Sequence, residues 1–164
     1  MTKYSLRTAV LETANPILGS AGFAFEEHEI VRGVYTFTRK RKDGLFEAVV
    51  FGVGKYRHQF GVDLAIVWAG QHPMDALPAM PRLSSRDREI GVRDSLGRVV
   101  FDDRDVLGRD VYEWATDEEL REKVAELAKL ALRHGPSYWD WQSERLKKPR
   151  MLGTRRIRRK EPRP

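Results

Sequence analysis

An alternation of apolar and smaller residues with a period of two, from Phe60 to Trp68, is the sequence feature that most constrains the fold. Successive side chains of a strand point to opposite faces, so the pattern predicts a β-strand with one face in a core. That apolar face consists of every second residue: Phe60, Val62, Leu64, Ile66 and Trp68. Such a strand needs neighbouring strands and a second layer that covers its apolar face.

Two segments upstream supply the neighbouring strands. Residues 34–38 are β-branched or aromatic, and residues 45–53 are apolar on both faces, which predicts a central strand covered on both sides. Asp43-Gly44 lies between them and indicates a type I′ hairpin turn, whose two central residues both have positive φ. With a further strand around 25–31, these segments predict an antiparallel meander that ends near residue 69.

Apolar residues spaced three to four apart predict a helix at 5–19, with a kink or break at Pro16, which cannot donate a backbone hydrogen bond. Residues 70–89 hold three prolines and many polar residues, which predicts a long loop. Beyond that loop, 90–93 and 98–101 are expected to pair as a hairpin.

A capping box indicates where a helix begins in the C-terminal part of the chain. The Thr116 hydroxyl can accept from the amide of Glu119, and the Glu119 carboxylate can reach back. An apolar stripe then predicts a helix over 117–134, ended by Gly135-Pro136. A second, short helix is expected at 137–147.

These elements predict an α+β fold, in which an N-terminal and a C-terminal helix pack on an antiparallel meander sheet of about four to six strands. Residues 1–145 are expected to form one domain, and residues 146–164 a flexible basic tail.

Charge is distributed unevenly along the chain. Of 164 residues, 30 are Lys or Arg and 24 are Asp or Glu, a net charge of +6, but residues 145–164 hold ten basic residues and one acid. The preceding 144 residues therefore carry −3. Dense arginine and lysine bind phosphates by releasing counterions, so we expect a nucleic-acid or acidic-partner site in the tail. Its residues are Arg150, Arg155, Arg156, Arg158, Arg159 and Lys160. A solubilising tail without a specific partner is the alternative.

Trp139 and Trp141 lie just upstream of these cations. Aromatic rings beside cations stack on the bases of single-stranded nucleic acids, so both residues are candidates for stacking or partner contact. The alternative is that Trp139 and Tyr138 pack onto the sheet.

Signals for catalysis are weak. The chain has no cysteine, its four histidines lack metal-ligand spacing, and the acidic cluster around Asp103 and Asp105 fails the calcium-loop pattern, so we expect no metal and no cofactor. Asp63 and Glu47 could form a carboxylate pair, and His58 lies in a tight turn where exposure is the simpler interpretation. The sequence therefore assigns no catalytic residue.

A helix ending at Gly22-Phe23, a hairpin, an apolar strand and the segment Phe60-Gly61-Val62-Asp63-Leu64 follow one another in this chain. This order resembles small bacterial α+β domains of unknown function, some of which are similar to immunity proteins of polymorphic toxin systems. The resemblance covers about residues 5–134 and leaves the tail out. It implies a non-enzymatic, protein-binding role with no catalytic residues to carry over.

The sequence therefore favours a non-enzymatic binding protein of bacterial type, immunity-like or accessory, that recognises a macromolecular partner. The alternative is a nucleic-acid-binding protein with the basic tail as its main contact. An enzyme using Asp63, Glu47 or His58 is a third hypothesis. Because no signal peptide or membrane span is evident, a cytoplasmic location without membrane contact is expected.

Overall fold

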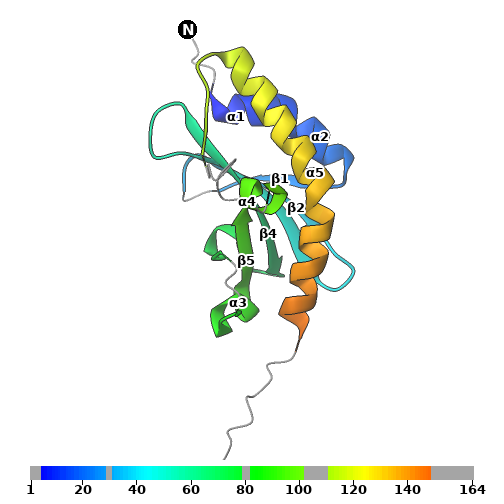
Figure 1. Cartoon of the computed structure of the whole chain (residues 1–164). Coiled ribbons are helices and arrows are strands. Elements are labelled where there is room, and N and C mark those ends of the chain that lie inside the picture. The colour runs from blue at the N-terminus through cyan, green and yellow to red at the C-terminus, as the bar shows by residue number, and fades with distance from the viewer. Residues whose placement is uncertain (1–4, 29–30, 79–81, 102–110, 149–164) are drawn as a thin grey trace, which may run out of the picture.

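The computed structural model describes residues 5–28, 31–78, 82–101 and 111–148. It shows an antiparallel sheet with helices packed on one face, which confirms the α+β prediction (Figure 1). Five strands follow one another in the order β1-β2-β3-β4-β5, and β6 pairs with the start of β4. The strands are β1 Ala24–Glu27, β2 Val34–Lys40, β3 Leu45–Val53, β4 Gln59–Trp68, β5 Gly91–Ser95 and β6 Tyr112–Glu113.

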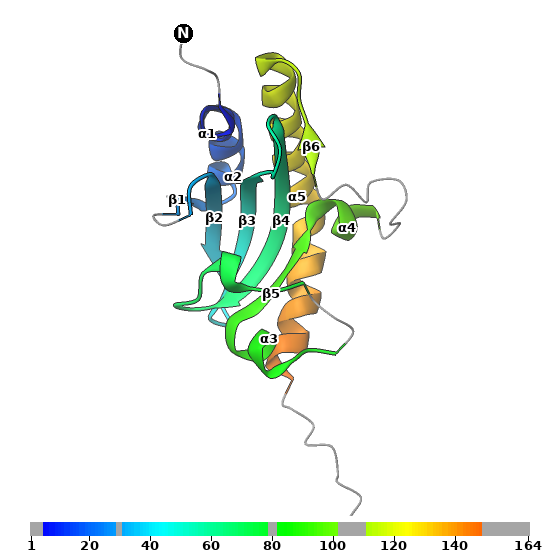
Figure 2. The ribbon, with the colours of Figure 1, turned by 90° about the vertical axis from the view of Figure 1, so that its left-hand side faces the viewer.

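The helical layer lies behind the sheet in Figure 2, where α1, α2 and α5 share one face. The described helices are α1 Leu6–Ala9, a π turn at Val10–Ala14, α2 Asn15–Ser20, a 3-10 turn at Pro73–Asp75, α3 Ser85–Ile90, α4 Leu96–Phe101 and α5 Asp117–Lys147. In this part of the chain no helix has both the length and the apolar character that a membrane span needs.

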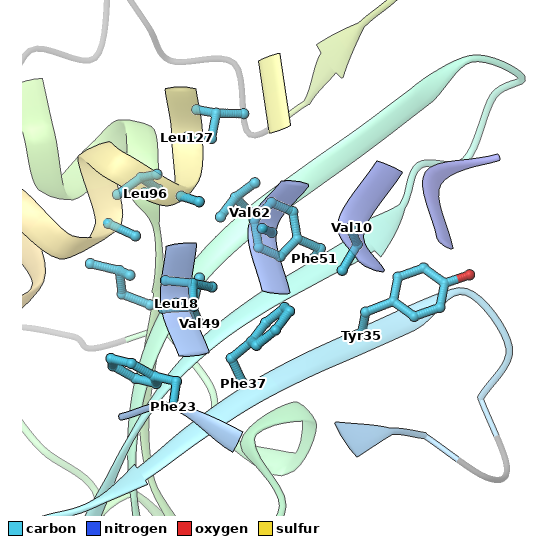
Figure 3. Close-up of a cluster of buried hydrophobic side chains, with 14 of the residues drawn as sticks. Val10, Leu18, Phe23, Tyr35, Phe37, Val49, Phe51, Val62, Leu96 and Leu127 are labelled. Carbon is cyan, nitrogen blue, oxygen red and sulfur yellow. The ribbon is translucent and has the colours of Figure 1, made fainter. Parts of the chain in front are cut away.

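The core lies between the sheet and the helices. Side chains from β3 and β4 meet those of the N-terminal helices and α5, as Figure 3 shows for Phe51, Val62, Val10 and Leu127. The alternating face of β4 points into this core, as predicted. A smaller cluster of buried residues, Val34, Ala48, Val50 and Ala65, occupies the opposite sheet face. The central strand is thus covered on both sides, because its two apolar faces belong to different clusters.

Residues 6–20 stay helical through Pro16, where the sequence predicts a kink or break. The preceding residues form a π turn, in which the Asn15 amide donates to the Val10 carbonyl, five residues back. This wider turn accommodates a proline that has no amide hydrogen to donate.

A Schellman motif ends this helical segment at Gly22, whose φ is +90°. The Gly22 amide donates to the Gly19 carbonyl at 3.0 Å, and the Phe23 amide donates to the Leu18 carbonyl at 3.1 Å. Leu18 and Phe23 are both buried in the core. The Gly22-Phe23 pair therefore stops the helix and anchors its end.

The β2–β3 hairpin forms where Asp43-Gly44 predicts it, but its turn is not type I′. Gly44 has a φ of +86°, whereas Asp43 does not have a positive φ. The Gly44 amide donates to the Arg41 carbonyl, and Asp43 Oδ1 accepts from the Leu45 amide at 3.2 Å. The extra loop residues remove the need for two positive φ angles.

α5 is one helix of 31 residues, whereas the sequence predicts two helices divided at Gly135-Pro136. Trp139 packs against Gly135 so closely that a Cβ there would lie 2.4 Å from the indole. Packing of the second half onto the core holds the helix together across the proline. The predicted N-terminus is confirmed, since the Thr116 hydroxyl accepts from the Glu119 amide.

The segment 82–101 differs most from its prediction. A capping box between Ser84 and Asp87 begins α3, so a helix fills part of the predicted loop. β5 exists but pairs with β4, and residues 98–101 belong to α4 rather than to a partner strand. Leu96 is buried in the core with Val99 packed beside it, and this 3-residue spacing favours a helix over a strand.

Candidate binding site

A cleft of about 490 Å³ lies between the C-terminal half of α5 and the β5–α4 segment. Figure 1 shows α4 and β5 beside α5. Arg98 of α4 and Arg133 and His134 of α5 contribute cationic or basic side chains to its lining. Further along α5, Tyr138, Trp141 and Gln142 complete the helical side, because residues three, four and seven apart share a helix face. We call this the α5 cleft.

A buried hydrogen bond joins the two sides of the α5 cleft. The Tyr138 hydroxyl donates to Asp94 Oδ2 at 2.8 Å, and both side chains are buried. Burial, and then the charge of Asp94 and this hydrogen bond, raise the pKa of the Tyr138 phenol well above its ordinary value. The phenol therefore remains a donor, and Asp94 is held as a fixed acceptor, with Arg98 at 3.9 Å from its Oδ1.

Trp141 is the exposed aromatic residue of the cleft, with 57% of its surface accessible. The Arg145 guanidinium lies 4.8 Å from the centre of its ring. Arg145 also donates to Gln142 Oε1 at 2.9 Å, which fixes the orientation of that amide. The Gln142 Nε2 is buried and has no hydrogen-bond partner among the described residues. The cleft thus combines an exposed ring, cations, a fixed acceptor and an unsatisfied donor.

The structure separates the two tryptophans that the sequence groups together. Trp139 is fully buried and lies 5.6 Å from Phe23, centre to centre, so it has no free face for a ligand. Trp141 keeps its role as a candidate for stacking. The six basic candidates lie outside the described residues: Arg150, Arg155, Arg156, Arg158, Arg159 and Lys160. They follow in sequence directly after the helix that carries Trp141.

Glu47 and Asp63 do not form a carboxylate pair. Asp63 pairs in register with Val50, so it shares a sheet face with that residue, and Glu47 is three residues away on the other face. Glu47 is buried between Arg39 at 2.6 Å and Arg41 at 2.8 Å. Arg41 also reaches Asp140 at 2.9 Å, so this cluster ties the β2–β3 hairpin to α5. Its role is structural.

His58 is an exposed turn residue, in agreement with the simpler interpretation, with a φ of 61° and Trp114 beside it at 5.4 Å. The acidic cluster around Asp103 and Asp105 lies outside the described residues. Within the described part of the chain, no three His, Asp or Glu side chains come together as a metal site would require.

Sequence reasoning misses most of the α5 cleft. Asp94 and Tyr138 are 44 residues apart, and the sequence places Asp94 in a hairpin turn. The available signal is the recurrence of Tyr138, Trp141 and Arg145 at helical spacing, which the predicted break at Gly135-Pro136 does not disturb.

Two histidines that are far apart in sequence lie side by side just after the end of β1. The rings of His28 and His72 are 4.4 Å apart, and His72 Nδ1 accepts from the Met74 amide at 3.1 Å. Burial, and then the neighbouring His28, lower the pKa of His72 below its ordinary value of 6.5. The neutral ring is therefore the form that the fold favours.

We expect the free energy of unfolding to fall as the pH drops below 6.5 toward the lowered pKa of His72. The unfolded chain binds a proton there that folded His72 does not. His72→Asn keeps a capping acceptor without titrating, so its stability should decline less over this range. Urea unfolding at about pH 7.5 and about pH 5 measures the difference. An equal decline in both proteins would contradict this assignment.

Comparison with known proteins gives no match to a family model, to a curated protein or to a solved structure.

Proposed function

We propose that the protein is a non-enzymatic binding protein whose macromolecular partner is a single-stranded nucleic acid. The observation that favours this partner is Trp141, exposed beneath the Arg145 guanidinium at the edge of the α5 cleft. A base can stack on such a ring, and nearby cations can hold the backbone that follows.

Charge along α5 supports the same proposal. Arg98 and Arg133 line the cleft, and Arg145 lies over Trp141, so the cations accompany the exposed ring. The chain then continues into the basic cluster at 155–160, which contains four arginines and a lysine. Phosphate contacts by this cluster would supply sequence-independent affinity, and Trp141 would stack on a base face, which single strands expose and duplexes do not.

Trp141→Ala should weaken binding of a labelled single-stranded oligonucleotide by about 5- to 30-fold, because loss of one stacked base costs about 1–2 kcal/mol. Fluorescence anisotropy measures this. Tyr56→Ala is a matched control, since Tyr56 is 64% exposed and has Lys55 5.5 Å from its ring centre. The control should bind as the wild type does. No binding by the wild type at about 50 mM salt would refute the proposal.

A salt titration tests the contribution of the basic cluster. Substituting glutamine for Arg155, Arg156, Arg158 and Arg159 should flatten the dependence of log affinity on log salt by about 0.7 for each phosphate that the variant no longer neutralises. A slope equal to that of the wild type would show that these arginines do not bind phosphate.

A protein partner is the second candidate, in line with the resemblance to immunity proteins. A groove of about 590 Å³ favours it, because the groove runs over Val50 and Asp63 on the sheet face opposite the helices. Two exposed apolar residues, Val31 at 44% and Val53 at 53%, also line this groove. Recovery of a partner by the wild type but not by Val53→Asp would support this candidate.

A further inference from the structure

We propose that the α5 cleft is a pocket for one unstacked nucleobase, and that it prefers guanine. This inference rests on the proposed function, because it names the base that a bound strand would place in the cleft. The cleft volume of about 490 Å³ is in the usual range for a small-ligand pocket. Trp141 and Tyr138 give it aromatic walls, which suit a planar ring.

Asp94 supplies the selective contact. Its exposed fraction is 8%, and Tyr138 donates to its Oδ2, so the carboxylate is fixed in position at the wall of the cleft. An ionised carboxylate only accepts hydrogen bonds, and therefore it favours base edges that carry N–H groups. Guanine is the only base whose pairing edge offers two adjacent N–H donors, on N1 and on the exocyclic N2. Thymine offers one N–H between two carbonyls, which would face the carboxylate unfavourably.

Gln142 supplies an independent observation that points to a ligand. It lines the cleft, its exposed fraction is 1%, and its Nε2 has no partner among the described residues. A buried donor without a partner destabilises a protein, so a ligand that accepts a hydrogen bond from it is favoured. Arg145 bonds to the amide oxygen, so Nε2, which is buried in the wall of the cleft, is the group of this amide left for a ligand to reach. The O6 carbonyl of guanine, adjacent to N1, is an acceptor that could satisfy it.

The cations at the cleft complete the site for a nucleotide. Arg98 and Arg133 line the same cleft as Asp94, so a base held there would have guanidinium groups near its sugar and phosphate. The arginines therefore favour a charged nucleotide over a neutral planar ligand, while Asp94 and Gln142 distinguish its base.

The experiment compares two labelled strands with the full-length protein, an all-thymine 12-mer and the same strand with one central guanine. We expect the guanine strand to bind about tenfold more tightly. Replacing that guanine by hypoxanthine, which lacks the 2-amino group, should remove most of this increase in affinity, and this test needs no change in the protein. If neither strand binds, the proposed function fails; if both bind equally, only the guanine pocket is overturned.

Variants of the protein test whether the α5 cleft is responsible for the preference for guanine. Asp94→Asn should reduce the preference for guanine, the ratio of the affinities of this variant for the two strands, to within about twofold. Asp63→Asn is the matched control, since Asp63 lies on the opposite sheet face against Arg93, and it should keep the preference. A preference that survives in Asp94→Asn would overturn the assignment. Equimolar guanosine monophosphate should leave the strand bound; displacement would agree with a guanine pocket but overturn the strand as its ligand.

Discussion

Trp139→Ala is expected to lower the free energy of unfolding by about 3–5 kcal/mol. Trp139 is fully buried, its ring lies against Phe23, and it occupies the space that Gly135 leaves open. Alanine would leave a cavity between α5 and the end of the N-terminal helical segment. It would also remove the contact that supports α5 next to Pro136. Urea unfolding followed by circular dichroism measures the decrease in stability.

Two matched variants test whether burial of the Trp139 ring causes this loss of stability. Trp139→Phe keeps an aromatic ring and removes the indole Nε1, which is buried without a hydrogen-bond partner among the described residues, so its cost should stay below about 2 kcal/mol. Trp141→Ala, two residues along the same helix, should cost less than about 1 kcal/mol because its ring is exposed. Equal destabilisation by Trp139→Ala and Trp141→Ala would contradict the burial that separates them.

The sheet was predictable because its signals are local. The alternation from Phe60 to Trp68 and the glycine at residue 44 each act within a few residues, and the pairing of β3 with β4 keeps the alternating face of β4 in the core. The α5 cleft was not predictable in this way. Asp94 meets Tyr138 only after β5 pairs with β4 and α5 packs across the sheet.

The continuous α5 shows how packing overrides a local stop signal. A proline inside a helix costs about 3 kcal/mol, and a prediction from sequence must weigh that cost without knowing what the following residues pack against. Tyr138, Trp139 and Leu146 are all buried after the proline, and each such side chain contributes about 1.5–3 kcal/mol. Their sum exceeds the proline penalty, so the helix continues and places Trp141 and Arg145 beside the cleft.

Gly91→Ala is expected to lower the free energy of unfolding by about 3 kcal/mol or more. Gly91 begins β5 with a φ of +132°, a conformation that side chains strain, and a Cβ there would lie 2.1 Å from the Ile66 carbonyl oxygen. Ile66 cannot move aside, because β4 is paired with β3 on one side and with β5 on the other. The clash is therefore with backbone atoms at the centre of the sheet.

The same substitution should change the α5 cleft, because Gly91 fixes the position of the strand that carries Asp94 three residues later. In urea unfolding, Gly52→Ala is the control: a Cβ at Gly52 meets no atom within 4 Å and its φ is ordinary, so its effect should stay within about 1 kcal/mol. Below the unfolding transition, Gly91→Ala should bind the all-thymine and single-guanine strands with similar affinity, since Asp94 no longer sits against Tyr138. A wild-type unfolding midpoint for Gly91→Ala would contradict the close approach of β5 to Ile66 on which both effects depend.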